Sequence, residues 1–553
     1  MRHATRALAA LLPATFAAFI ACGGGDSGSD AAPAGSAGAA SGGAGGSAGA
    51  AGAAAGAAGG DDFQHGPFTP PTYAPGTRPA EVTFPATFLF GSASAGQQVE
   101  SGLKTDWVEW AKVPGKVATG EQPDGGPDFF AHVTEDVAAM KDAKLGAYRF
   151  SIELARVFPT RESFDQNQPD ADGLAKYDQL LDKLKTAGIT PMVTLHHFAW
   201  PSWMSAVGGT ASKEKQGWER PDVEQVFVEW ARRAATRWGK QVDWWVTVNE
   251  PNVASTVGYV LGAWPPGAAD AERMAAVQRA QVFAHAKAYD AIHQADTVDA
   301  DGDGKAAMVS MALHQRVYQP RDAKNPEDVA AADHATYFWN YWYLHALVRG
   351  DYDHDFDERL DGPMDKKAAP ELAGRFDYVG LNYYGRSLVA EKAAKVQYMG
   401  SQPSQMNLPG GLPKSQMGWD IYADGFGEVM EQLKPFGLPV FITENGVAAQ
   451  PTEPTRARYV ASHLFEVGWA IARGLDVRGY TYWSTTDNFE WQSGYCPQFG
   501  LYTVDFSKPD RPRSPANGRD TLAEIATSRK ITQSSIDALP AYPDKPGKSC
   551  KSL

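Results

Sequence analysis

Residues 244–251 read WWVTVNEP, an apolar and β-branched run that gives way to two polar residues and a proline. Such a run is typical of a strand covered on both faces, and the proline, which has no backbone N–H, ends its hydrogen-bond ladder. Residues 441–446, FITENG, repeat the pattern, with Gly446 free to turn sharply. Each stretch therefore predicts a buried strand with a glutamate, Glu250 or Glu444, at its carboxyl end.

The same pattern extends along most of the chain. Six further apolar runs predict strands, and the longer stretches between them, such as 174–184, 223–238, 271–293 and 456–473, keep a helical period. Eight strands alternating with helices favour an α/β fold with a single enlarged (β/α)8 TIM barrel over a doubly wound open sheet. The predicted strands are 88–93, 147–152, 190–196, 244–248, 307–312, 378–383, 439–443 and 477–483.

A barrel gathers its functional groups where strands end and the following loops begin. A doubly wound sheet would instead bind its ligand at one switch point through a glycine loop for phosphate, and the sequence has no such loop. Polar residues do stand near or just past the ends of the predicted strands: Gln98, Arg149, His197, Asn249, Glu250, Asn382, Tyr384, Glu444 and Glu490.

Cleavage of a glycosidic bond requires two carboxyl groups. One protonates the leaving oxygen, and the other attacks the anomeric carbon or activates water, through an oxocarbenium-like transition state. Either Glu250 or Glu444 alone would more readily be a surface or helix-capping acid. Two such acids at the ends of separate strands of one barrel indicate a glycosidase site.

Several stretches resemble, in order, the motifs of glycoside hydrolase family 1, the β-glucosidase/β-galactosidase family. The resemblance spans roughly residues 81–530, and chance agreement of so many independent motifs is negligible. The motifs are FLFG at 88–91 with QVE at 98–100, YRFSI at 148–152, TLHHF at 194–198, TVNEP at 247–251, LNYY at 381–384, ITENG at 442–446 and DNFEW at 487–491.

The resemblance implies a retaining mechanism in which Glu444 is the nucleophile and Glu250 the acid/base. Arg149 and Tyr384 match groups beside the nucleophile, where a guanidinium and a phenol hydrogen bond favour the carboxylate. The two carboxyls lie about 5 Å apart in retaining enzymes, so the charge of Glu444 holds the proton on Glu250 until Glu444 is glycosylated. Asn249 matches the residue that holds the sugar 2-hydroxyl.

The same resemblance implies a pocket for a sugar ring. A carboxylate at Glu490 accepts hydrogen bonds from neutral hydroxyls but repels a 6-phosphate, so we expect unphosphorylated sugars. Alone, each pocket residue would more readily be a packing or surface residue, and His197 a core histidine. The implied substrate-binding residues are Gln98, His197, Asn249, Asn382, Trp483, Glu490, Trp491 and Phe499.

Four positions depart from the family pattern. Leu154 stands where Trp is general, Gln97 where Tyr is common, Ala199 where Asp is common and Gln498 where Arg is common. Because an Asp and an Arg at the last two positions would be ion-pair partners, their joint absence bears on pocket packing and specificity.

Two other stretches lie outside this pattern. Residues 299–304, DADGDG, resemble the first half of a calcium loop, but Ser310 stands where an EF-hand needs an acid. A solvated turn before a strand is the better interpretation, and we assign no metal and no cofactor. Residues 388–416 predict a long loop at the pocket mouth, which either shapes the choice of leaving group or merely decorates the barrel.

The beginning of the chain predicts export. Residues 1–21, a basic start and an apolar run, are typical of a signal peptide. Cys22 follows FIA, similar to a bacterial lipobox, so lipidation is favoured over simple secretion. Residues 22–80 predict a flexible tether because Gly, Ala and Ser have little to bury. We expect residues 81–530 to be the catalytic barrel, 531–553 a C-terminal tail, and the protein an envelope lipoprotein, or periplasmic or extracellular.

Composition narrows the partners. The 51 Lys and Arg against 65 Asp and Glu give a net charge of −14, and no basic stripe is present, so nucleic acid is not an expected partner. Contact with a membrane is expected through the lipid anchor only. Of the three cysteines, Cys496 and Cys550 remain once Cys22 is lipidated, and a disulfide and two free thiols fit that count equally.

The main hypothesis is an exo-β-glycosidase that hydrolyses β-glucosides, or β-galactosides or β-fucosides, through a covalent glycosyl-enzyme. A transglycosylase would use the same residues and differ only in how its leaving-group side excludes water. A sugar-binding lipoprotein on a barrel scaffold would be expected to lose Glu250 or Glu444, and both are present.

Overall fold

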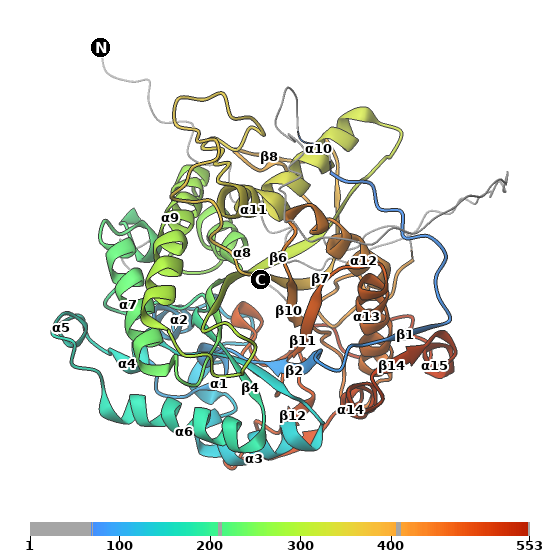
Figure 1. The fold of residues 1–553 in the computed structure, drawn as a ribbon, viewed down its shortest axis with the longest axis horizontal. Coiled ribbons are helices and arrows are strands. Elements are labelled where there is room, and N and C mark those ends of the chain that lie inside the picture. The colour runs from blue at the N-terminus through green and yellow to red at the C-terminus, as the bar shows by residue number, and fades with distance from the viewer. Residues whose placement is uncertain (1–67, 69, 208–212, 405–410, 551–553) are drawn as a thin grey trace.

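The computed structural model describes residues 68, 70–207, 213–404 and 411–550. Eight parallel strands close into a barrel in the order β10-β11-β2-β3-β4-β5-β6-β7, and helices surround it (Figure 1). The predicted (β/α)8 barrel is confirmed. Its strands are β2 (Leu89–Ala93), β3 (Ala147–Ser151), β4 (Thr190–His196), β5 (Trp244–Asn249), β6 (Met308–Pro320), β7 (Val379–Val389), β10 (Val440–Asn445) and β11 (Val477–Trp483).

Long helices connect the strands, as their helical period predicts. In α6 and α7 the last helical residue directly precedes Gly188 and Gly239, and Gly188 adopts φ 71°, a value that glycine tolerates best. The longer helices are α3 (Phe129–Asp142), α6 (Ala171–Ala187), α7 (Val223–Trp238), α9 (Ala271–Ala295), α10 (Pro326–Thr336), α12 (Ala423–Glu431), α13 (Thr455–Ala472) and α14 (Arg519–Ser528). Short helices include α1 (Gly96–Val99), α2 (Asp106–Ala111), α4 (Leu154–Val157), α5 (Arg161–Asp165), α8 (Pro251–Ser255), α11 (Trp342–Leu344) and α15 (Gln533–Ala538).

The barrel is a packed core rather than a channel. Side chains from alternate strand positions form a buried cluster separate from the one between strands and helices, as expected for a barrel interior. Its members are Met192, Trp244, Val246, Met308, Ala312, Tyr378 and Phe441.

Two barrel strands run further than predicted. β6 and β7 stay paired from Ala312 with Gly380 to Pro320 with Val389, well past the predicted ends at residues 312 and 383. This paired extension adds a wall to the carboxyl-terminal end of the barrel. Beyond it, part of residues 388–416 forms a small hairpin of β8 (Lys395–Val396) and β9 (Gly400–Ser401), while residues 405–410 lie outside the described residues.

The two ends of the folded region lie side by side. Strand β1 (Glu81–Thr83) pairs antiparallel with β14 (Lys530–Thr532), so the predicted domain boundary at residue 530 falls inside a strand. Short strands β12 (Tyr502–Val504) and β13 (Arg513–Pro515) form another pair. Cys496 and Cys550 are joined by a disulfide, which holds the C-terminal segment against the loop after β11.

Residues 299–304 form a turn in front of β6, in line with the solvated-turn interpretation. Asp299 accepts the backbone N–H of Gly302 at 2.6 Å and of Gly304 at 2.9 Å.

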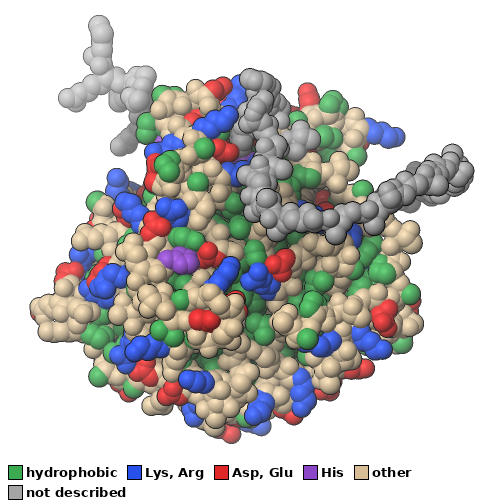
Figure 2. All heavy atoms as spheres, in the orientation of Figure 1, with side chains coloured by type: hydrophobic (Ala, Val, Ile, Leu, Met, Phe, Trp, Pro, Cys, Tyr) green, Lys and Arg blue, Asp and Glu red, His purple; other side chains and the backbone are tan. Residues whose placement is uncertain are grey.

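The signal peptide, Cys22 and most of the tether lie outside the described residues. No helix in the described ranges is long and apolar enough to cross a membrane. The face shown in Figure 2 carries acidic and basic side chains interspersed.

Gly446 has a packing role that the sequence pattern did not predict. Its φ lies outside the left-handed region, so a sharp turn is not the reason for glycine. A Cβ atom at this position would instead overlap the carbonyl oxygen of Trp483 in β11. The Cβ position is fixed by the backbone of β10 and the loop after it, and the carbonyl belongs to the backbone of β11. Neither can move without distorting the barrel.

We therefore expect Gly446→Ala to lower the free energy of unfolding by about 2 kcal/mol through overpacking. Gly146→Ala is the matched control because the nearest atom to its Cβ would be Phe90 O at 3.9 Å, and its change should be about 0.5 kcal/mol or less. Urea unfolding of the two variants measures the difference. Equal unfolding midpoints would contradict the packing argument.

Candidate active site

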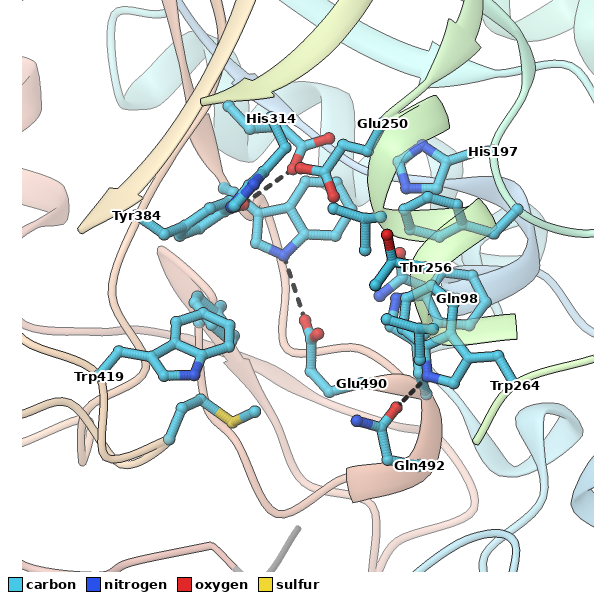
Figure 3. Close-up of a pocket in the computed structure, with 18 of the residues that line it drawn as sticks. Gln98, His197, Glu250, Thr256, Trp264, His314, Tyr384, Trp419, Glu490 and Gln492 are labelled. Atoms are coloured by element: carbon cyan, nitrogen blue, oxygen red, sulfur yellow. Dashed lines mark hydrogen bonds between the residues drawn. The ribbon is translucent and has the colours of Figure 1, made fainter. Parts of the chain in front are cut away.

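A pocket opens at the carboxyl-terminal ends of the barrel strands (Figure 3). Glu250 directly follows β5 and Glu444 is the penultimate residue of β10, and both side chains line the pocket although they are only 7% and 4% exposed. Among the predicted substrate-binding residues, Gln98, His197, Trp483, Glu490, Trp491 and Phe499 also line it. Asn249 and Asn382 are buried behind the wall, where Asn382 hydrogen bonds to both Asn249 and Glu250.

Glu444 is held by a cation and a phenol. Arg149 Nη1 donates to its Oε1 at 2.5 Å, and Tyr384 Oη donates to its Oε2 at 2.8 Å. Arg149 is 1% exposed, so its charge is removed from water and acts strongly on the carboxylate. Burial, and then the charge of Glu444, raise the pKa of Tyr384 well above its usual value, which keeps the phenol protonated as a donor.

The polar contacts continue from Glu444 to Glu250. Arg149 Nη2 donates to Asn249 Oδ1 at 2.7 Å, and Asn382 Nδ2 donates to the same oxygen at 3.1 Å and to Glu250 Oε1 at 2.8 Å. Thr443 Oγ1 donates to Asn382 Oδ1 at 2.7 Å and fixes the orientation of that amide. Both carboxyls therefore belong to one hydrogen-bonded network.

The two glutamates differ in proton affinity. Burial, reinforced by the charge of Glu444, raises the pKa of Glu250 to about 8. Burial also raises the pKa of Glu444, but Arg149 and the hydrogen bond from Tyr384 oppose that rise. Because the cation and the phenol act on Glu444 directly, the pair carries its negative charge there and its proton on Glu250 near neutral pH.

The backbone of Glu250 adopts a conformation that is uncommon for residues other than glycine. Its φ is 43° and ψ 59°, in the left-handed region, where it caps α8 directly before Pro251. A residue before proline is already restricted, and such outliers cluster at functional sites because the surroundings must hold them. The strand end and the proline together point the carboxyl into the pocket.

Several buried polar atoms on the pocket wall have no protein partner within the described residues, and two of them belong to predicted sugar-binding residues. His197 Nδ1 and Gln98 Oε1 are buried and make no hydrogen bond. Burial holds the pKa of His197 well below its usual value, and its Nε2 accepts from Asn249 Nδ2 at 3.2 Å, so Nδ1 carries the hydrogen. One free donor and one free acceptor thus face the same cavity, an arrangement that suits hydroxyl groups.

Aromatic rings and a third carboxyl complete the wall. Trp483 Nε1 donates to Glu490 Oε1 at 3.1 Å, and the His197 ring stacks on Trp483 at 5.7 Å. Burial raises the pKa of Glu490 to about 8. At neutral pH its carboxyl can therefore donate as well as accept a hydrogen bond.

The four residues that depart from the family pattern make different contacts in the structure. Ala199 packs in a cluster with Trp107, Trp264, Phe489 and Trp491 beside the pocket. Leu154 is buried in the core, and Gln97 Oε1 accepts from Thr105 Oγ1 at 2.6 Å. Gln498 Nε2 reaches Asp487 Oδ2 at 3.5 Å, and burial raises the pKa of Asp487 while Arg456 opposes the rise.

Several pocket residues were missed by sequence reasoning. His314 and Arg316 lie on the extension of β6, and Trp419 follows the long loop after β7. Val317 and Tyr318, two residues that favour strands, follow the polar residues 314–316 and were the available signal for a longer strand. The other lining residues are Phe198, Val253, Thr256, Val257, Leu261, Trp264, Trp339, Met417 and Gln492.

Comparison with known proteins identifies the family. The sequence model described as glycosyl hydrolase family 1 matches residues 80–531. A β-galactosidase of Pyrococcus woesei is 29% identical over 513 residues, covering 81% of this chain and 99% of the relative. β-Glucosidase A of Thermotoga maritima is 31% identical over 451 residues, covering 77% of this chain and 94% of the relative.

Solved structures agree with the fold as well. A family 1 β-glucosidase from Thermotoga maritima superimposes with a TM-score of 0.70 at 27% identity, covering 82% of this chain and 99% of that one. A β-glycosidase from Pyrococcus horikoshii gives 0.69 at 29% identity, covering 83% and 99%. With a paired-glutamate pocket at the barrel mouth and a family match across nearly the whole barrel, this chain is a glycoside hydrolase that belongs to glycosyl hydrolase family 1.

Proposed function

We propose that the protein is a retaining exo-β-glycosidase that hydrolyses unphosphorylated β-glucosides, with β-galactosides or β-fucosides as further substrates. The observation that carries the proposal is the asymmetry of the glutamate pair. Arg149 and Tyr384 donate hydrogen bonds to Glu444 at 2.5 and 2.8 Å, whereas the Asn382 amide is the only side chain among the described residues that donates to Glu250. A nucleophile must be ionised and a general acid protonated, and these contacts favour the ionised form of Glu444 and leave the proton on Glu250.

In the first step, Glu444 attacks the anomeric carbon while the proton of Glu250 passes to the leaving oxygen, and the glycosidic bond breaks. The ester that forms on Glu444 removes its charge, so Glu250 can stay ionised. In the second step, Glu250 takes a proton from water as the water oxygen attacks the anomeric carbon and Glu444 departs as a carboxylate. Two inversions at one carbon give net retention.

The wall of the pocket supports a terminal, unphosphorylated sugar as the group transferred. His197 Nδ1 and Gln98 Oε1 offer one donor and one acceptor, and Glu490 offers both near neutral pH. Above its pKa of about 8, Glu490 would also repel a 6-phosphate. Among the described residues that line the pocket, Arg316 is the only Lys or Arg, and it lies on β6 rather than beside Glu490.

We also propose that the enzyme is exported and held on the cell envelope by a lipid on Cys22. Support comes from the basic and apolar residues 1–21 and from the small residue before the cysteine. The Gly/Ala/Ser-rich segment behind it would let a surface-held barrel reach its substrates.

Aryl β-glucosides with good and poor leaving groups test the catalytic roles. Wild type should hydrolyse both kinds, and Glu444→Ala should lower kcat roughly 10³-fold or more on both, because no covalent intermediate can form. Glu250→Ala should lower kcat about 10²–10⁴-fold for poor leaving groups and much less for good ones, because only poor ones need the proton. Steady-state kinetics measure both effects.

The stereochemistry of the first product provides the independent control. ¹H NMR of an early time point should show the β-anomer of the released sugar. The α-anomer, or no hydrolysis of any glycoside, would refute the proposal, as would near-wild-type rates for Glu444→Ala.

The pH dependence of kcat/KM should be bell-shaped. Activity falls as pH rises through the pKa of Glu250, about 8, because the acid loses its proton, and it falls at low pH as Glu444 becomes protonated. Tyr384→Phe removes a donor to the carboxylate of Glu444 and should move the acid limb to higher pH. Measuring kcat/KM against pH with a poor leaving group, which needs the proton of Glu250, reports both limbs; an acid limb that moves to lower pH would contradict the role of Tyr384.

If Cys22 carries a lipid, the protein should partition into detergent, and removal of Cys22 should change this. With its own signal sequence in a bacterial host, wild type should enter the detergent phase of a Triton X-114 separation, and Cys22→Ala should enter the aqueous phase. Both should retain activity, since Cys22 precedes the barrel by nearly 60 residues. Aqueous partition of the wild type would refute the anchor and leave the hydrolase unaffected.

A further inference from the structure

Arg316 is a buried cation on the wall of the active-site pocket. It lies on the extension of β6 and is 7% exposed. Nη1 donates to Ser387 Oγ at 3.0 Å, and Nη2 lies 3.0 Å from His314 Nε2. Within the described residues the guanidinium makes no ion pair, and Nε has no hydrogen-bond partner. Buried charges are normally paired, so this one requires an explanation.

His314 lies between two donors. Its Nε2 faces the Arg316 guanidinium, and its Nδ1 lies 3.1 Å from Trp339 Nε1. Guanidinium and indole can only donate, whereas a neutral imidazole has one N–H and one lone pair. Burial and the charge of Arg316 hold the pKa of His314 well below its usual value, so the ring is neutral. Only one ring nitrogen of His314 can accept a hydrogen bond, so in the other contact an N–H of His314 faces an N–H of its neighbour. The cluster therefore lacks a hydrogen-bond acceptor.

The cluster lies on the side of the pocket where the leaving group must be. The charge of Arg316 reaches Glu250 and lowers its pKa, and Glu250 is the group that protonates the leaving oxygen. Figure 3 shows His314 on the same side of the pocket as Glu250 and across the pocket from Glu490. Glu490, in the proposed function, contacts the sugar that is transferred.

We propose that Arg316, His314 and Trp339 form a subsite for a carboxylate-type oxyanion carried by the leaving-group part of the substrate; this inference rests on the proposed function. An oxyanion supplies the acceptors that the cluster lacks. The guanidinium fork matches a carboxylate in a bidentate manner, and Trp339, whose ring centre is 6.0 Å from Arg316 Cζ, helps to hold the fork in place.

Matched substrates test the subsite. The 4-carboxyphenyl and 4-carbamoylphenyl β-D-glucosides differ in charge but hardly in shape, and the 3-substituted pair covers a second direction. At pH 6.5, wild type should show a kcat/KM at least about tenfold higher for the carboxylate than for the amide, at one ring position or both. A disaccharide of glucose linked to glucuronic acid, compared with one linked to glucose, distinguishes a uronic acid from an aromatic acid as the source of the charge.

Variants assign the preference to Arg316. Arg316→Met should bring the ratio of carboxylate to amide to about one, and Arg316→Lys should keep part of it. Lys287→Met removes an exposed charge on α9, outside the pocket, and should keep the wild-type ratio. Because the wild-type ratio alone tests the subsite, a variant that fails to fold does not remove the test.

Equal rates for both members of every pair in the wild type would overturn the inference and leave the proposed function standing. If Arg316→Met changes both rates by one factor and only moves the basic limb of the pH profile to higher pH, Arg316 tunes Glu250 and the subsite is refuted. Absence of hydrolysis of every glucoside refutes the proposed function and the subsite with it.

Discussion

The positive charge of Arg149, buried in the middle of β3, is the interaction on which the site depends. Arg149 contacts Thr194 of β4 at 3.0 Å, Asn249 of β5 at 2.7 Å and Glu444 of β10 at 2.5 Å. In the order of the barrel, β10 and β3 are separated by β11 and β2, so the ion pair crosses the mouth. Only a closed barrel brings these four strands within reach of one guanidinium. The buried charge of Arg149 would be costly without Glu444, and that of Glu444 without Arg149.

The same contact distinguishes two otherwise similar glutamates. Both end apolar strands, and both are buried, which alone would raise the pKa of each. Of the two glutamates, Arg149 and Tyr384 donate hydrogen bonds to Glu444, whereas the Asn382 amide donates one to Glu250. Chemical roles therefore follow from which neighbours each strand end meets, rather than from the residue type. Asn249, which contacts Arg149 on one side and His197 on the other, connects the charged pair to the pocket wall.

Most of the barrel could be predicted from the sequence because its strands are buried on both faces and therefore read as apolar runs. The ends of β4 and β11 coincide with prediction for that reason. Glu250, Glu444 and Arg149 were predictable as well, since they follow or interrupt such runs. The extension of β6 was not, because its polar residues His314, Gln315 and Arg316 break the apolar pattern that defines a barrel strand. It forms through pairing with β7, which is a tertiary effect.

Other features depend on proximity that no single stretch encodes. The sequence pattern predicts a sharp turn at Gly446, whereas the constraint in the structure is the carbonyl of Trp483 on the next strand. The pairing of Cys496 with Cys550 depends on the path of the C-terminal segment. Trp419 reaches the pocket because the chain returns there after the loop that follows β7. Each of these is a contact between segments distant in sequence.

The distribution of donors and acceptors gives the pocket two ends of different chemistry. Near Gln98 and His197 one buried acceptor and one buried donor are unused, which suits hydroxyl groups because each can both give and take a hydrogen bond. Around His314 the Arg316 guanidinium and the Trp339 indole can only donate, and the guanidinium carries a full charge and a buried Nε that has no partner within the described residues. A neutral sugar satisfies the first end and cannot satisfy the second as well as an oxyanion can. Glu250 lies between the two, so the bond it protonates would join a neutral group to an acidic one.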